Sequence, residues 1–430
     1  MVEPPIEAKN KGKVWLLKKA VYGLWDGSRR WYMEVEKQFE LLGGKKCKND
    51  QAFFYFHDGK KLRGLVCLHV DDMYITGDES FRNEVKAPLL KIFVFGTNES
   101  DNFKFTGINF RTINRESILL DQDDYIQNMV EINIDKNKKA EDNLSDEEMK
   151  VFRKAIGQIQ WAQSGTRPDL SVEGLFMSTK NKQAKIKDLE FAKRTIENVK
   201  KTKQKEARFP VQIKFKRLGH WKDLHIEGYG DASFRNAEDK VKSVGGDVIL
   251  LCNDYGDAVP IYWQSKTIKQ VCSSVKSAET LQMWKTTEDA IYISRIFFEI
   301  YNGDHRKSIP EDDLSFPDLG QLPVDIFTDS KTLHESVYSS TQISEKLLRA
   351  RIQLIQEKLD EKSQAKIRNI FHVRNHHMLA DCLTKLRASP GKLMKLLREA
   401  KIPDFKEWQK EIGRQKDLKI KDGQDKEYNQ

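Results

Sequence analysis

The sequence predicts an α/β protein in which a mixed β-sheet is covered by helices. Two observations support this. Short apolar segments typical of strands alternate with longer segments of helical period through the second half of the chain, an order that favours a sheet with covering helices. The 430 residues include 39% hydrophobic and 10% aromatic side chains, which is enough for about two to four domains, each with a core.

The N-terminal part predicts one helix and a β-hairpin. Residues 1–12 are polar and form an irregular lead-in. A helix follows the glycine-containing loop at 23–28, because apolar residues recur at helical spacing as far as Phe39. Strands are predicted at 52–56 and 64–70, since the segment between them, His-Asp-Gly-Lys, is typical of a hairpin connection.

Two adjacent acids, Asp71 and Asp72, interrupt the apolar stretch from Val66 to Gly77. Residues 66–70 are predicted to form a buried strand, and residues 73–76 its return. Asp is a common turn residue, so a polar hairpin turn is one interpretation. A divalent-metal site is the other, because unpaired carboxylates near a core are costly and hard cations prefer carboxylate oxygen.

Further helices and strands are predicted in the middle of the chain. They are, in order, a helix at 80–92, strands at 103–112 and 117–121, a helix at 124–134, and a helix from 145 to 163. Ser145 is suited to begin the last helix as its N-cap, because Glu148 follows three residues later.

A basic helix is predicted next, with Leu189, Ala192 and Ile196 on one face. From Thr179 to Arg208 the sequence contains eleven Lys and Arg residues and four acids. A solvated helix face and a nucleic-acid-binding surface both explain this charge.

Strands and helices alternate after a change in composition at residues 208–224. The predicted strands lie at 223–229, 246–252, 259–264, 324–328 and 367–374, and the predicted helices at 277–302 and 345–362. Residues 391–430 contain eleven Lys and Arg residues and eight acids, and are predicted to form a helix followed by a frayed end.

Four acids lie at the ends of these predicted elements. Asp231 and Asp329 follow strands, whereas Glu279 and Asp381 stand near helix starts. One such acid alone is explained by a turn or a helix cap. Four carboxylates gathered at one sheet edge would repel each other, and two magnesium ions would resolve this repulsion. We therefore interpret the set as metal ligands.

The composition narrows the class of protein. Lys and Arg number 74 against 65 acids, and the formal charge of +9 favours an anionic partner such as nucleic acid. The five cysteines are scattered without a Cys-x-x-Cys pair, which indicates neither a disulfide framework nor a cysteine-based zinc site. A reducing intracellular compartment, cytoplasm or nucleus, is expected. The sequence has no signal-peptide pattern and no apolar run long enough for a membrane span.

An ordered series of motifs resembles the C-terminal part of a copia-type retrotransposon Pol polyprotein, reverse transcriptase followed by ribonuclease H. The motifs are Leu17 to Leu24, Ser28 to Tyr32, His69 to Asp72 with Thr76 and Gly77, Phe105 to Ile108, Ile156 to Trp161, and Thr166 to Asp169, followed by the four acids. The resemblance runs from about Pro4 to Lys385. Single motifs of this kind are weak signals, but their order is specific.

This resemblance implies a domain organisation. Residues 1–112 would form the C-terminal part of a polymerase palm, and residues 113–208 a thumb or connection that includes the basic helix. Residues 220–390 would form a ribonuclease H-like domain with a mixed five-stranded sheet and helices. Residues 391–430 would be a charged C-terminal tail.

The resemblance also implies site residues and a reaction. Two Mg²⁺ or Mn²⁺ ions would be held for hydrolysis of RNA in an RNA–DNA hybrid by Asp231, Glu279, Asp329 and Asp381. Independently of the resemblance, His372 or His376 is a candidate for proton transfer near that site, and a surface or packing role, which is more frequent for a lone histidine, is the alternative. The paired acids of the polymerase palm would be Asp71 and Asp72. At the place of His69, that family usually has an aromatic residue.

Contacts with the nucleic-acid backbone are expected from basic side chains, and such contacts would be independent of sequence. The candidates are Arg29, Arg30, Lys200, Lys201, Lys203, Lys266 and Lys269.

The polymerase site is expected to be incomplete. By resemblance, a third metal-binding aspartate belongs upstream of the segment that begins at Val2. The alternatives are a non-catalytic, nucleic-acid-binding transposon remnant, or a polymerase that a partner chain completes at the exposed half of the palm.

We therefore expect that the purified chain does not extend a primer. Incorporation of labelled nucleotide on a primed RNA template is the measurement. Incorporation that is abolished by Asp71→Asn would contradict this expectation.

Overall fold

A computed structural model describes residues 14, 16, 23–201, 213–236, 242–303, 321–339, 346–360, 363 and 367–415. The chain divides into two compact units, Met1–Asn98 with Glu299–Pro310, and Glu99–Phe298 with Glu311–Gln430. Among the helices in the described ranges, none has the length and apolarity that crossing a membrane requires.

The first unit contains an antiparallel sheet with the strand order β1-β2-β3-β4. Its strands are β1 (Gly44–Lys46), β2 (Phe53–Asp58), β3 (Lys61–His69) and β4 (Asp72–Gly77). Its helices are α1 (Gly27–Leu41), α2 (Glu79–Phe81), the π-helical turn η1 (Arg82–Lys86) and α3 (Ala87–Ile92). The apolar face of α1 packs on the sheet through Val35 and Phe39, which are fully buried. The predicted hairpins and helices of this region are therefore present.

The second unit begins with another antiparallel sheet, of order β5-β6-β7-β8. Its strands are β5 (Asn102–Phe105), β6 (Ile108–Asn114), β7 (Ser117–Asp121) and β8 (Ile213–Lys216). The domain boundary that the sequence places at residue 112 falls within β6, because β6 pairs with β5 on one side and β7 on the other.

A group of helices with its own apolar core follows. These helices are α4 (Asp123–Gln127), α5 (Asp146–Gly165), η2 (Pro168–Leu170), α6 (Ser171–Thr179) and α7 (Ile186–Lys201). Ser145 and Glu148 form the predicted capping box at the start of α5. The predicted helix at 124–134 is shorter than expected, because the Val130 N–H donates to the Gln158 side chain instead of continuing the helix.

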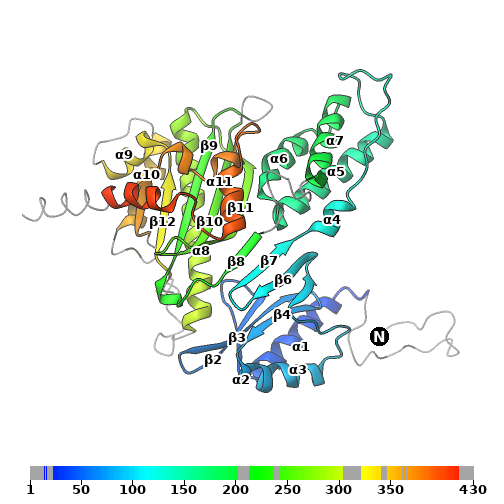
Figure 1. The fold of residues 1–430 in the computed structure, drawn as a ribbon, viewed down its shortest axis with the longest axis vertical. Helices are drawn as coiled ribbons and strands as arrows, with labels where there is room; N and C mark the ends of the chain where they lie inside the picture. The colour runs from blue at the N-terminus through cyan, green and yellow to red at the C-terminus, as the bar shows by residue number, and fades with distance from the viewer. Residues whose placement is uncertain are drawn as a thin grey trace, which may run out of the picture. The chain divides into compact units, whose positions relative to one another are not determined.

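The remaining strands form a mixed five-stranded sheet of order β11-β10-β9-β12-β13 (Figure 1). They are β9 (Leu224–Ser233), β10 (Val244–Asn253), β11 (Ala258–Thr267), β12 (Val324–Thr328) and β13 (Asn369–His372). The first three are antiparallel, whereas β12 runs parallel to both β9 and β13. The sequence-based prediction of an α/β fold with a mixed five-stranded sheet is confirmed.

One face of this sheet is covered by α8 (Val275–Asn302), with α9 (Lys331–Tyr338) and α10 (Lys346–Leu359) beside it. Helix α8 lies close to β9 because glycines face it. An added Cβ at Gly228 would lie 3.0 Å from a Thr286 methyl carbon, and one at Gly230 would lie 2.5 Å from the Thr286 hydroxyl oxygen.

The other face is covered by C-terminal helices, as α11 (Gly391–Glu399) in front of the sheet shows (Figure 1). A further helix, at residues 405–415, places Trp408 and Ile412 in the same core. The sequence assigns residues 391–430 to a charged tail, but residues 391–415 pack on the sheet. Their charges lie on one side of each helix, and their apolar side chains are buried on the other.

We expect Trp408→Ala to lower the free energy of unfolding by about 3–5 kcal/mol, because the deletion leaves a cavity in the core. The indole ring is 8% exposed and lies 5.6 Å from the ring of Phe327, centroid to centroid. Denaturant unfolding followed by circular dichroism measures the loss. Lys410→Ala, at an exposed position of the same helix, is the matched control. Equal midpoints for the two variants would contradict this packing.

Candidate active site

Three carboxylates meet at one edge of the five-stranded sheet. Asp231 lies near the end of β9, Asp329 directly follows β12, and Glu279 lies near the start of α8. Parallel pairing of β9 with β12 brings the first two together, because Phe327 lies opposite Tyr229. One oxygen from each of the three carboxylates lies within 4.8 Å of the other two. The structure thus gathers three of the four acids that the sequence singled out.

The fourth acid, Asp381, lies next to this group and is joined to it by a lysine. Asp381 begins the 3-10 turn η5 (Asp381–Leu383). The Lys385 ammonium donates to the Asp381 carboxylate and lies 3.8 Å from an Asp231 oxygen. The Thr384 hydroxyl donates to Asp231. The sequence analysis assigned no role to Thr384 or Lys385. Their positions three and four residues after Asp381 indicate that they can lie beside it in one helical turn.

Close packing holds η5 against the sheet. Gly246 lies opposite Asp231 on β10, and an added Cβ there would lie 2.7 Å from the Leu383 Cβ. The Ser265 hydroxyl donates to the Leu383 carbonyl at 2.5 Å, and the Asn236 amide donates to the Thr384 carbonyl at 3.0 Å. These contacts fix the segment that carries Asp381.

Burial makes charging of the three central acids unfavourable. Burial, and to a smaller extent the like charges of Asp231 and Asp329, raise the pKa of Glu279 to about 9. Burial also raises the pKa of Asp231 to about 6, against the lowering effect of Lys385. The pKa of Asp329 is raised by burial as well. A proton or another cation among these carboxylates would relieve this cost.

A second buried charge cluster lies behind η5. Arg167 is 1% exposed, and its guanidinium donates to both oxygens of Asp169 at 2.8 and 2.7 Å. This pair belongs to the Thr-Arg-Pro-Asp motif, and η2 packs against η5. Burial raises the pKa of the nearby Glu173 to about 7. The motif therefore supports the turn that bears Asp381.

The two candidate histidines have different surroundings. His372 ends β13, and its Nε2 lies 3.2 Å from the backbone carbonyl of Asp329. His376 instead faces Glu407, with 3.5 Å between Nε2 and the nearer carboxylate oxygen. A role in proton transfer stays a prediction for both.

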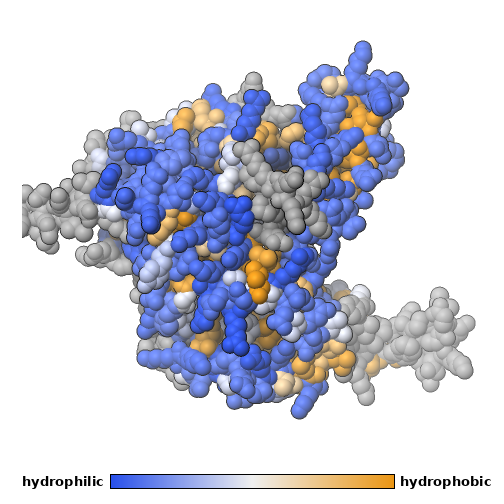
Figure 2. All heavy atoms as spheres, viewed as in Figure 1, coloured by the Kyte–Doolittle hydropathy of each residue, from blue (hydrophilic) through white to orange (hydrophobic). Residues whose placement is uncertain are grey.

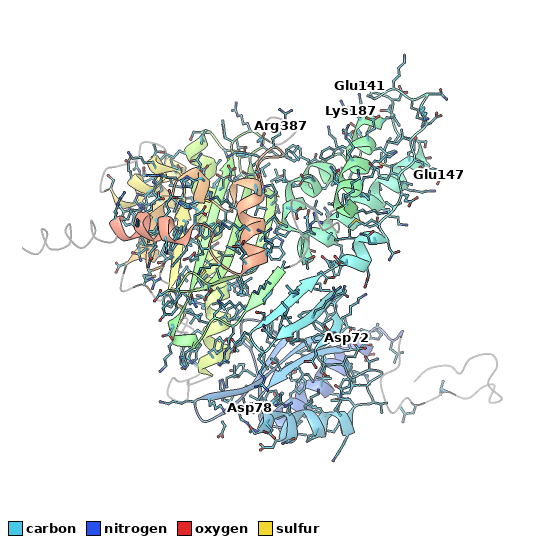
Figure 3. All side chains as sticks on the ribbon, viewed as in Figure 1. Asp72, Asp78, Glu141, Glu147, Lys187 and Arg387 are labelled. Atoms are coloured by element: carbon cyan, nitrogen blue, oxygen red, sulfur yellow. The ribbon has the colours of Figure 1, made fainter. Side chains whose placement is uncertain are left out.

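The paired acids of the first unit lie at a hairpin turn. Residues Val70 and Asp71 connect β3 to β4, and Val70 has a positive φ of 57°. Asp71 and Asp72 are both exposed, and Figure 3 labels Asp72 at the start of β4. Within the described ranges, neither belongs to a group of three metal-ligating side chains. The local structure is thus the polar turn, and a metal-binding role stays a prediction.

The basic candidates are dispersed. Arg29 and Arg30 are exposed on α1, and Arg30 pairs with Asp26 at 2.6 Å. Lys266 and Lys269 are exposed at the end of β11 and just beyond it. Lys201, the last residue of α7, is also exposed, whereas Lys203 lies outside the described residues.

Two lysines of the basic helix α7, and Lys185 just before it, bind other groups of the protein. The Lys200 ammonium donates to the Met129 carbonyl at 2.8 Å. Lys185 and Lys187 both pair with Glu141, at 2.7 and 2.8 Å, and Figure 3 shows Lys187 beside Glu141. Charged and polar side chains nevertheless cover most of the visible surface (Figure 2).

Comparison with known proteins gives matches over much of the chain. Residues 1–141 match the family model described as "Reverse transcriptase (RNA-dependent DNA polymerase)". The retrovirus-related Pol polyprotein from transposon RE1 of Arabidopsis thaliana is 24% identical over 322 residues, which cover 70% of this chain and 20% of that protein. The corresponding polyprotein from transposon TNT 1-94 of Nicotiana tabacum is 24% identical over 326 residues, 70% of this chain and 23% of that protein. The chain thus spans about a fifth of the length of these relatives.

Solved structures also match parts of the chain. LC11-RNase H1, isolated from compost by a metagenomic approach, matches with 16% identity and a TM-score of 0.24, covering 37% of this chain and 91% of that one. The protease–reverse transcriptase of prototype foamy virus matches with 14% identity and a TM-score of 0.23, covering 43% of this chain and 21% of that one.

We expect Glu279→Gln to stabilise the metal-free chain. With a pKa of about 9, the folded state keeps a proton on Glu279 that the unfolded state loses above about pH 4.5. Stability therefore falls as pH rises between these values. The variant should be more stable by roughly 2 kcal/mol or more at pH 8.

Denaturant unfolding in the presence of a chelator, between pH 5 and pH 9, measures this effect. Glu288→Gln, at an exposed position of the same helix, should follow the wild-type pH dependence. A Glu279→Gln curve that also follows it would show that Glu279 is not a proton-binding group of the empty site.

Proposed function

We propose that this chain hydrolyses the RNA strand of RNA–DNA hybrids. The comparisons confirm its expected similarity to copia-type retrotransposon Pol polyproteins. The reaction would take place at Asp231, Glu279, Asp329 and the adjoining Asp381. The observation that carries the proposal is the convergence of three carboxylates within 4.8 Å at one sheet edge. The match of residues 1–141 to a reverse transcriptase family supports a nucleic-acid substrate.

The donor set suits hard divalent cations. All the ligands are carboxylates, which Mg²⁺ and Mn²⁺ prefer over softer groups. The Lys385 ammonium, 3.8 Å from Asp231, supports the idea that positive charge is favourable at this place. When bound, two such ions supply activation of water and stabilisation of the leaving 3′ oxygen.

The chain's own residues position the reacting groups. The Thr384 hydroxyl orients one oxygen of Asp231, and Lys385 holds Asp381 toward the same centre. The His372 Nε2 lies 3.2 Å from the Asp329 backbone carbonyl, next to the carboxylate group. Of the two candidate histidines, the position of His372 therefore favours it for proton transfer.

Backbone contacts with the hybrid are assigned to exposed lysines. Lys266 and Lys269 lie on and after β11, which belongs to the same sheet as Asp231. Neither requires a particular base sequence, because an ammonium group binds phosphate as a point charge. A non-catalytic, nucleic-acid-binding protein is the alternative function, since the same lysines would serve it equally well.

Asp231→Asn should lower the rate of hybrid cleavage roughly a thousandfold or more, because it removes one charged ligand from a two-metal site. The assay uses the full chain, labelled RNA in a hybrid duplex, and Mg²⁺ or Mn²⁺. Glu279→Gln should behave alike. Asp223→Asn, at an exposed position before β9, is the control and should cut at the wild-type rate.

Circular dichroism checks first that each variant is folded. A folded wild-type chain that binds the hybrid and leaves its RNA intact in Mn²⁺ would support the non-catalytic alternative. Equal cleavage by the wild type and by Asp231→Asn would show that the activity lies elsewhere or comes from a contaminant.

Affinity for the hybrid should fall steeply with added salt, because phosphate contacts release counterions. Replacing Lys266 and Lys269 by Gln should reduce the slope of log K against log salt by about one for each lysine that contacts a phosphate. Lys200→Gln should leave the slope unchanged, since that ammonium is bound to the Met129 carbonyl. A salt-independent wild-type affinity would contradict binding through charge.

A further inference from the structure

Two histidines and two glutamates form a second cluster of possible metal ligands. His376 and His377 lie on the 3-10 turn η4 (Asn375–His377), and Glu407 and Glu411 lie one turn apart on the helix at 405–415. One ligand atom each of His376, His377 and Glu407 lies within 4.8 Å of the other two. Glu411 faces the same group, with 3.7 Å between its Oε2 and the His377 Nε2.

We propose that these four side chains form a binding site for one transition-metal ion, with Zn²⁺ as the best fit. Two imidazoles and carboxylate oxygens are typical Zn²⁺ ligands, whereas sites for Mg²⁺ are built from oxygen alone. The ion at this site would therefore be of a different chemical class from the ions proposed at Asp231.

An unpartnered buried nitrogen points to a missing ligand. His377 is only 4% exposed, and within the described part of the chain its Nε2 has no hydrogen-bond partner. Buried polar atoms in native proteins are nearly always bonded, and each exception calls for an explanation such as an unplaced ion. A metal ion beside Nε2 would give this nitrogen a partner.

Two of the ligand-atom separations are close to those of a tetrahedral site. Bonds of about 2.0 Å to a tetrahedral zinc place neighbouring ligand atoms about 3.3 Å apart. The His376–Glu407 and His377–Glu411 pairs are separated by 3.5 and 3.7 Å, longer than a good hydrogen bond. A small inward movement would therefore bring each of these two pairs to the separation found around zinc.

The surrounding structure holds the two ligand-bearing segments in place. Trp408 and Ile412 anchor the helix in the sheet core, which turns Glu407 and Glu411 toward η4. On the other side, the His377 N–H donates to the Arg374 carbonyl at 2.8 Å and closes the turn. The ligands are thus presented by packed elements.

Ion pairing without a metal is the competing explanation. The Arg374 guanidinium lies 3.9 Å from Glu407 and 4.0 Å from Glu411. These ion pairs are all 3.5 Å or longer, beyond a good hydrogen bond, and in the described residues they leave the buried His377 Nε2 without a hydrogen-bond partner.

The test measures metal binding to the full chain, independently of nuclease activity. The metal-stripped protein is kept in excess Mg²⁺, which occupies the carboxylate site, and is titrated with Zn²⁺ by calorimetry. Co²⁺ is used in parallel as a spectroscopic probe. We expect about one equivalent of Zn²⁺ and the visible absorption of tetrahedral Co²⁺ without a thiolate charge-transfer band.

Variants locate the ion. The combination of His376→Gln and Glu407→Gln should weaken Zn²⁺ binding at least about tenfold. These side chains are 43% and 58% exposed, so the fold should persist. His220→Gln, at an exposed position, is the matched control and should bind Zn²⁺ like the wild type.

Two results would overturn the proposal. One is the absence of Zn²⁺ binding, or an equal affinity in the variant and the wild type. The other is a cobalt–thiolate band, which would place the ion instead at the buried group of His225, Glu227 and Cys252. Neither result bears on hybrid cleavage, so the two proposals fail independently.

Discussion

The gathering of Asp231, Glu279 and Asp329 at one edge of the five-stranded sheet is the constraint on which the candidate site depends. Three like charges close together at a buried edge are unfavourable, and the pKa of Glu279, raised to about 9 by burial and its neighbours, reflects this cost. The packing of α8 on Gly228 and Gly230 nevertheless holds Glu279 beside the other two. A cation bound there, as proposed above, would offset this cost.

Support for this edge comes from distant parts of the second unit. Lys385 links Asp381 to Asp231, and Gly246 allows η5 to approach the sheet closely. Behind η5, the buried pair of Arg167 and Asp169 lies at the junction of two groups of helices. The helices after β7 therefore contact the five-stranded sheet. For example, the Trp263 indole N–H donates to the Gln163 carbonyl at 2.6 Å. Separating the two parts into independent domains would remove such contacts.

The C-terminal helices link stability to both proposed metal sites. Leu393, Leu396 and Trp408 complete the core on the face of the sheet opposite α8. The Gln415 side chain bonds both the N–H and the carbonyl of His372, which satisfies the exposed edge of β13 next to Asp329. The same helix carries Glu407 and Glu411. It thus contributes to the core, to the sheet edge near the carboxylates, and to the histidine cluster.

The order of strands and helices, the capping box at Ser145 and the four separate acids could be predicted from the sequence, because period, cap residues and motif order are local properties. Local pattern also predicted the hairpin at Asp71. It did not show whether those acids would have a third carboxylate beside them.

Tertiary structure alone decided which acids meet. Parallel pairing of β12 with β9 brings together Asp231 and Asp329, nearly a hundred residues apart in the chain. Residues 391–415 are rich in charged side chains, but they form two helices whose apolar sides are buried in the core. This packing places Glu407 next to His376. The sequence likewise shows the charge of Lys200 but not the hydrogen bond from its ammonium to the Met129 carbonyl. Contacts between distant segments depend on three-dimensional packing, and a one-dimensional pattern of residues does not contain them.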